Sequence, residues 1–177
     1  VIDETSTQMG KRLLYSWILN PLIEKKDIDE RLRKVDMFFN NREILYKVKE
    51  ILSDVSDISR IIGKIGLGRA NGRDIKSLQI SLENINTLRN ELSEIPDISK
   101  ELDKYDFVIN SLVKEIDECI VDAPPLTILE GGVIKSSYNK EVEELRNLTG
   151  DSKGWIKEFE ENEKKEKKYF VYIQDDA

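Results

Sequence analysis

Histidine is missing from this 177-residue chain, and cysteine occurs once, at Cys119. Without imidazole the chain lacks the commonest general base and the commonest zinc ligand, and a single thiol forms no disulfide framework or cysteine metal cluster. Cys119 lies between Ile116 and Ile120 in a helical pattern, which favours a small buried apolar side chain over a nucleophile. We therefore expect no catalysis, no metal and no cofactor in this chain.

Aromatic residues make up only 7% of the sequence, and no apolar run is long enough to cross a membrane. No secretory signal is recognisable, so we expect a cytoplasmic protein without a membrane partner. Acidic residues outnumber basic ones by 35 to 28, which gives a net charge of −7 and no overall basic field for nucleic acid. A contact with DNA would need a local basic patch.

Charged residues are abundant, 36% of the sequence, and they surround apolar positions three and four residues apart. That spacing predicts helices with one apolar face. Four short helices are expected before residue 70, with apolar stripes over 9–18, 28–39, 44–52 and 58–65. The second stripe should face the interior; it consists of Ile28, Leu32, Val35 and Phe39. Polar residues at 3–7 and 56–57 can cap helices, and Asn20-Pro21 ends the first one.

Four glycines lie close together between Gly63 and Gly72, beside Lys64 and Arg69. Glycines near basic residues suggest a phosphate-binding loop. However, the spacing fits neither the Walker pattern nor the dinucleotide fingerprint, and no strand precedes it. We interpret the segment as the end of a helix followed by a turn.

Two longer apolar runs follow, one on each side of Pro96. The first consists of Ile75, Leu78, Leu82, Ile85, Leu88, Leu92 and Ile95. The second consists of Ile98, Leu102, Tyr105, Ile109, Leu112, Ile116 and Ile120. Two heptad-like helices around one proline turn predict an antiparallel helical hairpin. Pro124-Pro125 lies beyond the hairpin, and 126–130 is expected to be extended.

A third apolar stripe begins after Gly131-Gly132 and consists of Tyr138, Val142, Leu145, Leu148, Ile156 and Phe159. Ser136 or Ser137 can cap a helix here, and a helix unbroken to Lys168 would be about 45 Å long, the length of a lever. Glycines at 150 and 154 leave open two shorter helices joined there. The expected fold is all-α: a helical core domain over 1–136, which includes the hairpin, and a long lever helix within 137–177.

The end of the chain carries interleaved charges, with lysines at Lys153, Lys157, Lys164, Lys165, Lys167 and Lys168. One interpretation is a solvated helix crossed by ion pairs three or four residues apart. The other is a helix tip whose lysines meet DNA phosphates without reading sequence. Tyr169–Ile173 is β-prone and would form one short terminal strand, which needs a partner strand from elsewhere.

Several of these stretches, in the same order, resemble the core (lever) domain of MutS mismatch-repair proteins. The matching stretches are Asp3–Leu14, Trp17, Asn20-Pro21-Leu22, Ile28–Leu32, Asp57-Ile58, Gly68–Ile75, Pro124-Pro125-Leu126, Glu130–Lys135, Tyr138-Asn139 and Glu143–Arg146. The resemblance covers about Val1 to Phe159. One departure is Gly72, where the family usually has proline.

This resemblance implies a full-length dimeric ATPase that uses ATP and Mg²⁺ and recognises mismatched duplex DNA, with levers linking the ATPase end to clamps. It also implies other mismatch repair proteins as partners and a place on the nucleoid. The present sequence has no Walker loop, so we expect no ATP binding by this segment. The lysines near the tip of the lever helix would contact the DNA backbone.

In the family a clamp and a returning helix follow, and here Tyr169–Gln174 corresponds at most to a piece of the clamp. The apolar stripe of the lever then needs another cover, which predicts self-association of this segment. Two functions are expected on this basis. The first is a non-catalytic lever and clamp segment that couples ATP state to closure on DNA. The alternative is a helical scaffold or partner-interaction module, such as a MutS relative without mismatch reading, with no direct DNA contact.

Overall fold

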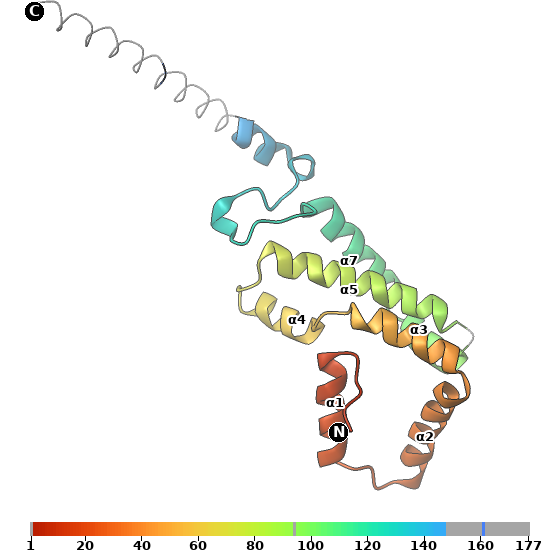
Figure 1. Ribbon diagram of the computed structural model, residues 1–177. Coiled ribbons are helices and arrows are strands. Elements are labelled where there is room, and N and C mark those ends of the chain that lie inside the picture. The colour runs from red at the N-terminus through yellow and green to blue at the C-terminus, as the bar shows by residue number, and fades with distance from the viewer. Residues whose placement is uncertain (1, 94, 148–160, 162–177) are drawn as a thin grey trace, which may run out of the picture. The chain divides into compact units, whose positions relative to one another are not determined.

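The computed structural model describes residues 2–93, 95–147 and 161, and the chain divides into two compact units, Val1–Ile134 and Lys135–Ala177 (Figure 1). The described residues form helices and turns with one isolated antiparallel bridge, between Ile120 and Ile134, and no strand. The predicted all-α class is therefore confirmed. The predicted domain division after residue 136 stays a prediction.

Four helices open the first unit: α1 (Gln8–Leu19), α2 (Lys25–Asn40), α3 (Arg42–Ser53) and α4 (Ile58–Gly66). The Thr7 hydroxyl caps α1 by accepting a hydrogen bond from the Gly10 amide at 2.9 Å. The Asp57 carboxylate caps α4 by accepting one from the Arg60 amide at 3.2 Å. Gly68 adopts a positive φ of 63° directly after α4, so the glycine-rich stretch ends a helix and turns, as predicted.

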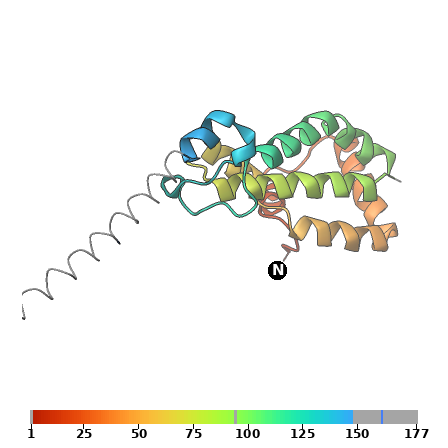
Figure 2. The same cartoon turned by 90° about the horizontal axis from the view of Figure 1, so that it is seen from above.

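The long helix α5 (Gly72–Glu91) is the spine of this unit and packs against α3, α4, α6 (Pro96–Asp103) and α7 (Asp106–Cys119). Figures 1 and 2 show α7 running back alongside α5, which confirms the predicted helical hairpin. At about 1.5 Å per residue, α5 is about 30 Å long. One helix therefore contacts most of the other elements of the unit.

The main core cluster lies where α3, α5 and α6 meet, and its buried members are Val48, Leu88, Leu92 and Ile95. In the middle of α5, Ser81 has no exposed surface. Its hydroxyl oxygen accepts a hydrogen bond from the Ser56 amide at 3.0 Å and donates one to the Ser77 carbonyl at 2.7 Å. The link between α3 and α4 is thus tied to the middle of α5.

The second half of the hairpin is two helices rather than the single one expected after Pro96. The break falls at Lys104 and Tyr105, where the sequence has neither proline nor glycine. Arg89 of α5 forms ion pairs with Asp103 at the end of α6 and with Asp106 at the start of α7. The Arg89 guanidinium on α5 therefore pairs with residues on both sides of the break. The spacing of apolar residues along a single helix does not predict such a break.

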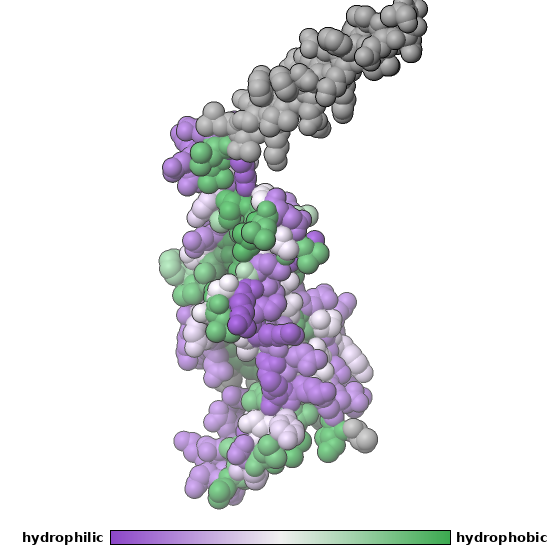
Figure 3. Space-filling view, turned by 90° about the vertical axis from the view of Figure 1, so that its left-hand side faces the viewer, coloured by the Kyte–Doolittle hydropathy of each residue, from purple (hydrophilic) through white to green (hydrophobic). Residues whose placement is uncertain are grey.

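The apolar stripe of α2 does not face the interior, contrary to prediction. Leu32, Val35 and Phe39 are 59%, 56% and 64% exposed, and Met37 and Phe38 pack on the core instead. Periodicity identifies an apolar face but not what covers it, and the described residues leave more than half of each of these three side chains exposed. Figure 3 shows hydrophobic patches among hydrophilic ones, including at its lower end, the height at which α1 and α2 lie in Figure 1.

Two expectations near the unit boundary are also wrong. Residues 126–130 are not extended, because Ile128–Glu130 forms a 3-10 turn closed by a capping box between Thr127 and Glu130. Neither Ser136 nor Ser137 caps the next α-helix, because Ser136–Tyr138 forms another 3-10 turn. Helical geometry begins at 140, and the Asn139 side chain accepts a hydrogen bond from the Glu141 amide at 2.8 Å.

Candidate functional site

The residues predicted to contact DNA lie outside the described part of the chain. They are Lys153, Lys157, Lys164, Lys165, Lys167 and Lys168. The β-prone segment 169–174, the glycines at 150 and 154 and the far end of the predicted lever helix lie outside it as well. What the structure describes is a helical stretch over 140–147, where the predicted lever helix would begin, and the unit that precedes it.

The junction between the two units is made by residues 121–134, which we call the strap. It follows α7 and ends where the second unit begins at Lys135. The Val121 amide donates a hydrogen bond to the Val133 carbonyl at 3.0 Å, beside the bridge between Ile120 and Ile134. The two ends of the strap are therefore hydrogen-bonded to each other and lie side by side.

The strap lies against the N-terminal end of α5. Arg73 Nε donates a hydrogen bond to the Pro124 carbonyl at 3.0 Å, and Asn71 Nδ2 donates one to the Leu126 carbonyl at 3.3 Å. Gly72, between these two donors, is buried. Three consecutive residues at the start of α5 thus face the strap.

The start of α5 is itself held in place by a carboxylate. Asn71 and Asp74 form a reciprocal capping box, in which Asn71 Oδ1 accepts from the Asp74 amide at 2.9 Å and Asp74 Oδ2 accepts from the Asn71 amide at 3.1 Å. Lys64 of α4 lies 2.6 Å from the same carboxylate. The hydrogen bond from Lys64, followed by that from the Asn71 amide, lowers the pKa of Asp74. The turn between α4 and α5 is therefore held by contacts from both helices.

A further polar cluster joins α5 to the first residues of the strap. Lys76 Nζ lies 2.9 Å from Gln79 Oε1 and 3.2 Å from a carboxylate oxygen of Asp122. It also lies 3.6 Å from a carboxylate oxygen of Asp117 on α7. Because only 13% of the Lys76 side chain is exposed, its charge is shielded from solvent and directed at these carboxylates. The strap is thus attached to α5 at Asp122 as well as at Pro124 and Leu126.

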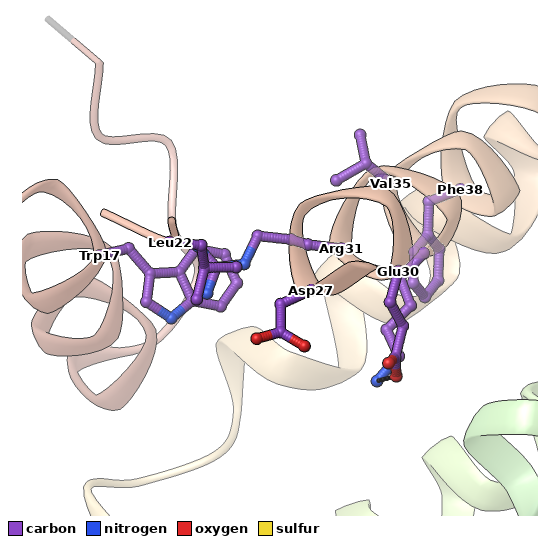
Figure 4. A pocket seen from close by; sticks show the side chains of 8 residues that line it. Trp17, Leu22, Asp27, Glu30, Arg31, Val35 and Phe38 are labelled. Atoms are coloured by element: carbon purple, nitrogen blue, oxygen red, sulfur yellow. Dashed lines mark ion pairs between the residues drawn. The ribbon is translucent and has the colours of Figure 1, made fainter. Parts of the chain in front are cut away.

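A second candidate surface is the groove between α1 and α2 (Figure 4). It has a volume of about 490 Å³, and its lining includes Trp17, Asp27, Arg31, Val35 and Phe38. The Arg31 guanidinium carbon lies 3.7 Å from the centroid of the Trp17 ring, a cation–π contact that joins the two helices. The groove combines apolar walls with charges at its edge, which suits an amphipathic partner.

The described residues also bear on metal binding, on the single thiol and on membrane spanning. Among the residues that the structure describes, no three acidic or cysteine side chains are grouped to hold a metal ion. Cys119 is half-buried and free rather than fully buried. None of the helices between residues 2 and 147 combines the length and the apolar character that crossing a bilayer requires. The contacts described for these surfaces are hydrogen bonds, ion pairs, a cation–π contact and apolar packing.

Sequence reasoning did not anticipate the strap contacts. Gly72 belongs to a predicted turn and to a stretch of family resemblance, but neither feature indicates its neighbours' partners, which lie about 50 residues further along, as with Arg73 and Pro124, 51 residues apart. Short-range spacing does not indicate such pairs. The one available signal was the order of unusual residues, a double proline and then a diglycine, which marks a loop of restricted shape.

Comparison with known proteins finds both a matching family model and similar proteins. The family model described as MutS domain III matches residues 1–173. The DNA mismatch repair protein MutS of Methanococcoides burtonii is 36% identical over 169 residues, covering 93% of this chain and 19% of that protein. MutS of Clostridium tetani is 35% identical over 165 residues, again covering 93% of this chain and 19% of that protein. The chain thus spans about a fifth of the length of the curated relatives it matches.

Proposed function

The chain belongs to the MutS family of DNA mismatch repair proteins, and we propose that it is a non-catalytic lever segment coupling the ATP state of a longer protein to closure on mismatched duplex DNA. The observation that carries the proposal is the match to MutS domain III over residues 1–173. ATP and Mg²⁺ would bind to other parts of the full-length protein. This segment would transmit the conformational change that accompanies the change of ATP state.

The packing of the first unit supports a mechanical role. A segment that relays displacement has to move as one body, and here α5 contacts four other helices, contributes Leu88 to the core cluster and contains the buried Ser81. The strap that leads to the second unit is hydrogen-bonded to the start of the same helix. Movement of α5 would therefore reach Lys135 with little slack.

The proposed DNA contact is made by lysines of the second unit. The six lysines between Lys153 and Lys168 would meet phosphates and position the protein without reading base sequence. A net charge of −7 makes this a local attraction rather than a property of the whole chain. A second copy of the protein and other mismatch repair proteins are its proposed partners.

The test is a titration of the full-length protein with a duplex carrying one mismatch, at 50 and 200 mM salt. The variant with Lys164→Glu and Lys165→Glu should bind more weakly at low salt. Each lost phosphate contact should reduce the slope of log affinity against log salt by about 0.9, or about 1.8 for the pair. Lys25 and Lys26, an adjacent exposed pair at the start of α2, provide a control with the same change of charge. Equal weakening by both double substitutions would remove the proposed contact and leave only an effect of net charge.

A second candidate function is partner docking, which the exposed face of α1 and α2 favours. We infer that the occupant is an amphipathic helix from the four-fifths of the full-length protein that this chain does not include, because the relatives are about five times longer. Covalent footprinting with mass spectrometry tests this inference. Peptides containing Val35 should be labelled at least fivefold less in the full-length protein than in the isolated chain, and equal labelling would refute the docking.

A further inference from the structure

The pair Asn71-Gly72 is the only asparagine followed by glycine in the sequence. Asparagine is a thermolabile residue, because its side-chain amide is lost when the backbone nitrogen of the next residue attacks the amide carbon. Glycine at the next position favours this attack, since it has no side chain to hinder it and its backbone rotates freely. Proline, which the family usually has at position 72, has no N–H and does not react in this way. The sequence therefore contains one asparagine that is chemically predisposed to deamidation.

Both polar atoms of the Asn71 side chain are hydrogen-bonded in the folded protein. As the N-cap of α5, Asn71 accepts through Oδ1 from the Asp74 amide at 2.9 Å, and its Nδ2 donates to the Leu126 carbonyl at 3.3 Å. Gly72 is buried and is the first residue of α5, where helix N–H groups have no partner within the helix. The attacking nitrogen and the amide carbon therefore belong to neighbouring residues, but the cap and the strap hold the amide in place.

The backbone conformation of Asn71 keeps these two atoms apart. A five-membered succinimide ring closes only when Asn71 Cβ and the Gly72 nitrogen are nearly eclipsed about the Cα–C bond. The extended conformation of Asn71, with φ of −107° and ψ of 176°, holds them staggered. Rotation of ψ toward the ring geometry would carry the side chain away from the Asp74 amide and the Leu126 carbonyl. Deamidation therefore has to follow opening of the cap.

We propose that Asn71 is a site of spontaneous deamidation that the cap of α5 protects, and that its conversion releases the strap from α5. A bond forms between the Gly72 nitrogen and Asn71 Cγ, and the bond between Cγ and Nδ2 breaks. The Gly72 amide proton passes to hydroxide, and Nδ2 leaves as ammonia with a proton from water. Water then opens the ring at either carbonyl carbon and gives aspartate or isoaspartate. Water is the only co-reactant.

Either product weakens the attachment of the strap. Both carry a carboxylate, which has no N–H for the Leu126 carbonyl and repels its oxygen. The carboxylate also adds a negative charge beside Asp74, the other member of the capping box. Aspartate can still cap a helix, whereas isoaspartate lengthens the main chain by one carbon and displaces the cap. The hydrogen bond from Arg73 to the Pro124 carbonyl would remain, so the strap would be loosened near Leu126 first.

The first experiment follows residue 71 in the full-length protein during incubation at mildly alkaline pH, by peptide mass spectrometry that separates asparagine, aspartate and isoaspartate. Asp74→Ala removes one half of the capping box, and Asp36→Ala, on the exposed surface of α2, is the control with the same change of charge. Conversion should be at least fivefold faster in Asp74→Ala than in the control and in the unsubstituted protein. Gly72→Pro should give no product, because proline has no N–H to attack with.

Each part of this chemistry has a result that would overturn it. If residue 71 stays intact in both the unsubstituted and the Asp74→Ala proteins while a synthetic peptide of residues 68–75 converts, the site is refuted. Equal conversion in Asp74→Ala and Asp36→Ala would refute protection by the cap. Conversion in Gly72→Pro as fast as in the unsubstituted protein would refute attack by the nitrogen of residue 72.

The second experiment measures hydrogen–deuterium exchange before and after the incubation, on peptides covering 121–134 and on peptides of the core around Leu88. Once residue 71 has converted, strap amides should exchange at least tenfold faster while core amides keep their rates. Asn71→Ser keeps an oxygen that can cap α5 and has no amide to lose, so incubation should leave its exchange unchanged. Unchanged strap exchange in the converted protein would refute release of the strap, and equally faster exchange around Leu88 would show that the whole unit has loosened instead.

Discussion

Replacing Asp57 by asparagine removes a charge but keeps a side-chain oxygen that can cap α4. Asp57 is bonded through both carboxylate oxygens to the Arg12 guanidinium of α1, at 2.6 and 2.8 Å. Its Oδ1 also accepts the capping hydrogen bond from the Arg60 amide. The hydrogen bonds from Arg12 are the main reason that the pKa of Asp57 is lowered from 3.8 to about 2. This pair links α1 to the start of α4.

The pKa difference sets an upper limit of about 2.4 kcal/mol on the stabilisation. Because 54% of the Arg12 side chain is exposed, solvent screens the pair, and we expect about 1 kcal/mol. Asp57→Asn should therefore lower the unfolding free energy by about 1 kcal/mol at pH 7. Asp57→Ala also loses the cap and should cost about 2 kcal/mol. Lys34→Gln, which breaks an exposed pair with Glu30, is the control and should cost under about 0.5 kcal/mol.

The pH dependence has a definite sign. The folded-state pKa of Asp57 is below its unfolded value, so the stabilisation is complete above about pH 4 and disappears as pH falls through about 2. Urea denaturation should show the gap between the parent chain and Asp57→Asn closing over that range. The difference in unfolding free energy between the two proteins is compared, rather than the stability of either one alone. Hydrogen bonds also lower the pKa values of Asp3 and Asp74, so those groups make both proteins pH-dependent and cancel in the difference. A gap that stays constant from pH 7 to pH 2 would refute this reasoning.

Three other predictions concern packing and association. Leu88→Ala should lower the unfolding free energy by about 2–5 kcal/mol in urea denaturation, because Leu88 is 8% exposed within the core cluster. Ser81→Ala should cost about 1–3 kcal/mol in the same assay by leaving the Ser56 amide without its partner, and a loss under about 0.3 kcal/mol would contradict that role. Sedimentation of the 177-residue chain should show self-association, whereas a clean monomer at high concentration would show that its apolar faces need no cover.

Local features of the first unit could be predicted from the sequence because their causes are local. The caps at Thr7 and Asp57 and the apolar repeat of α5 depend on residues only a few positions apart. The antiparallel pairing of α5 with α7 follows from two apolar stripes on either side of the proline turn at Pro96. Physical rules that act within a turn or two of helix were enough for these elements.

Features that depend on distant partners could not be predicted in this way. The bond between Arg12 and Asp57 joins residues 45 positions apart, and it takes the chain folding back to bring them together. The space that Gly72 leaves empty has meaning only once Pro124 lies against it. Likewise the stripe of α2 was correctly recognised as apolar but wrongly assigned to the interior, because periodicity does not identify what covers a face.

The most direct test of the lever is a flexible insertion between Ile134 and Lys135, where one unit ends and the next begins. Four residues, Gly-Ser-Gly-Ser, placed there in the full-length protein should leave folding and ATP affinity unchanged and abolish the ATP-dependent change in the dissociation rate of a mismatched duplex. The same insertion after Pro21, between α1 and α2, is the control and should leave that change intact. An unaltered response with the insertion at 134–135 would contradict a mechanical relay through this chain.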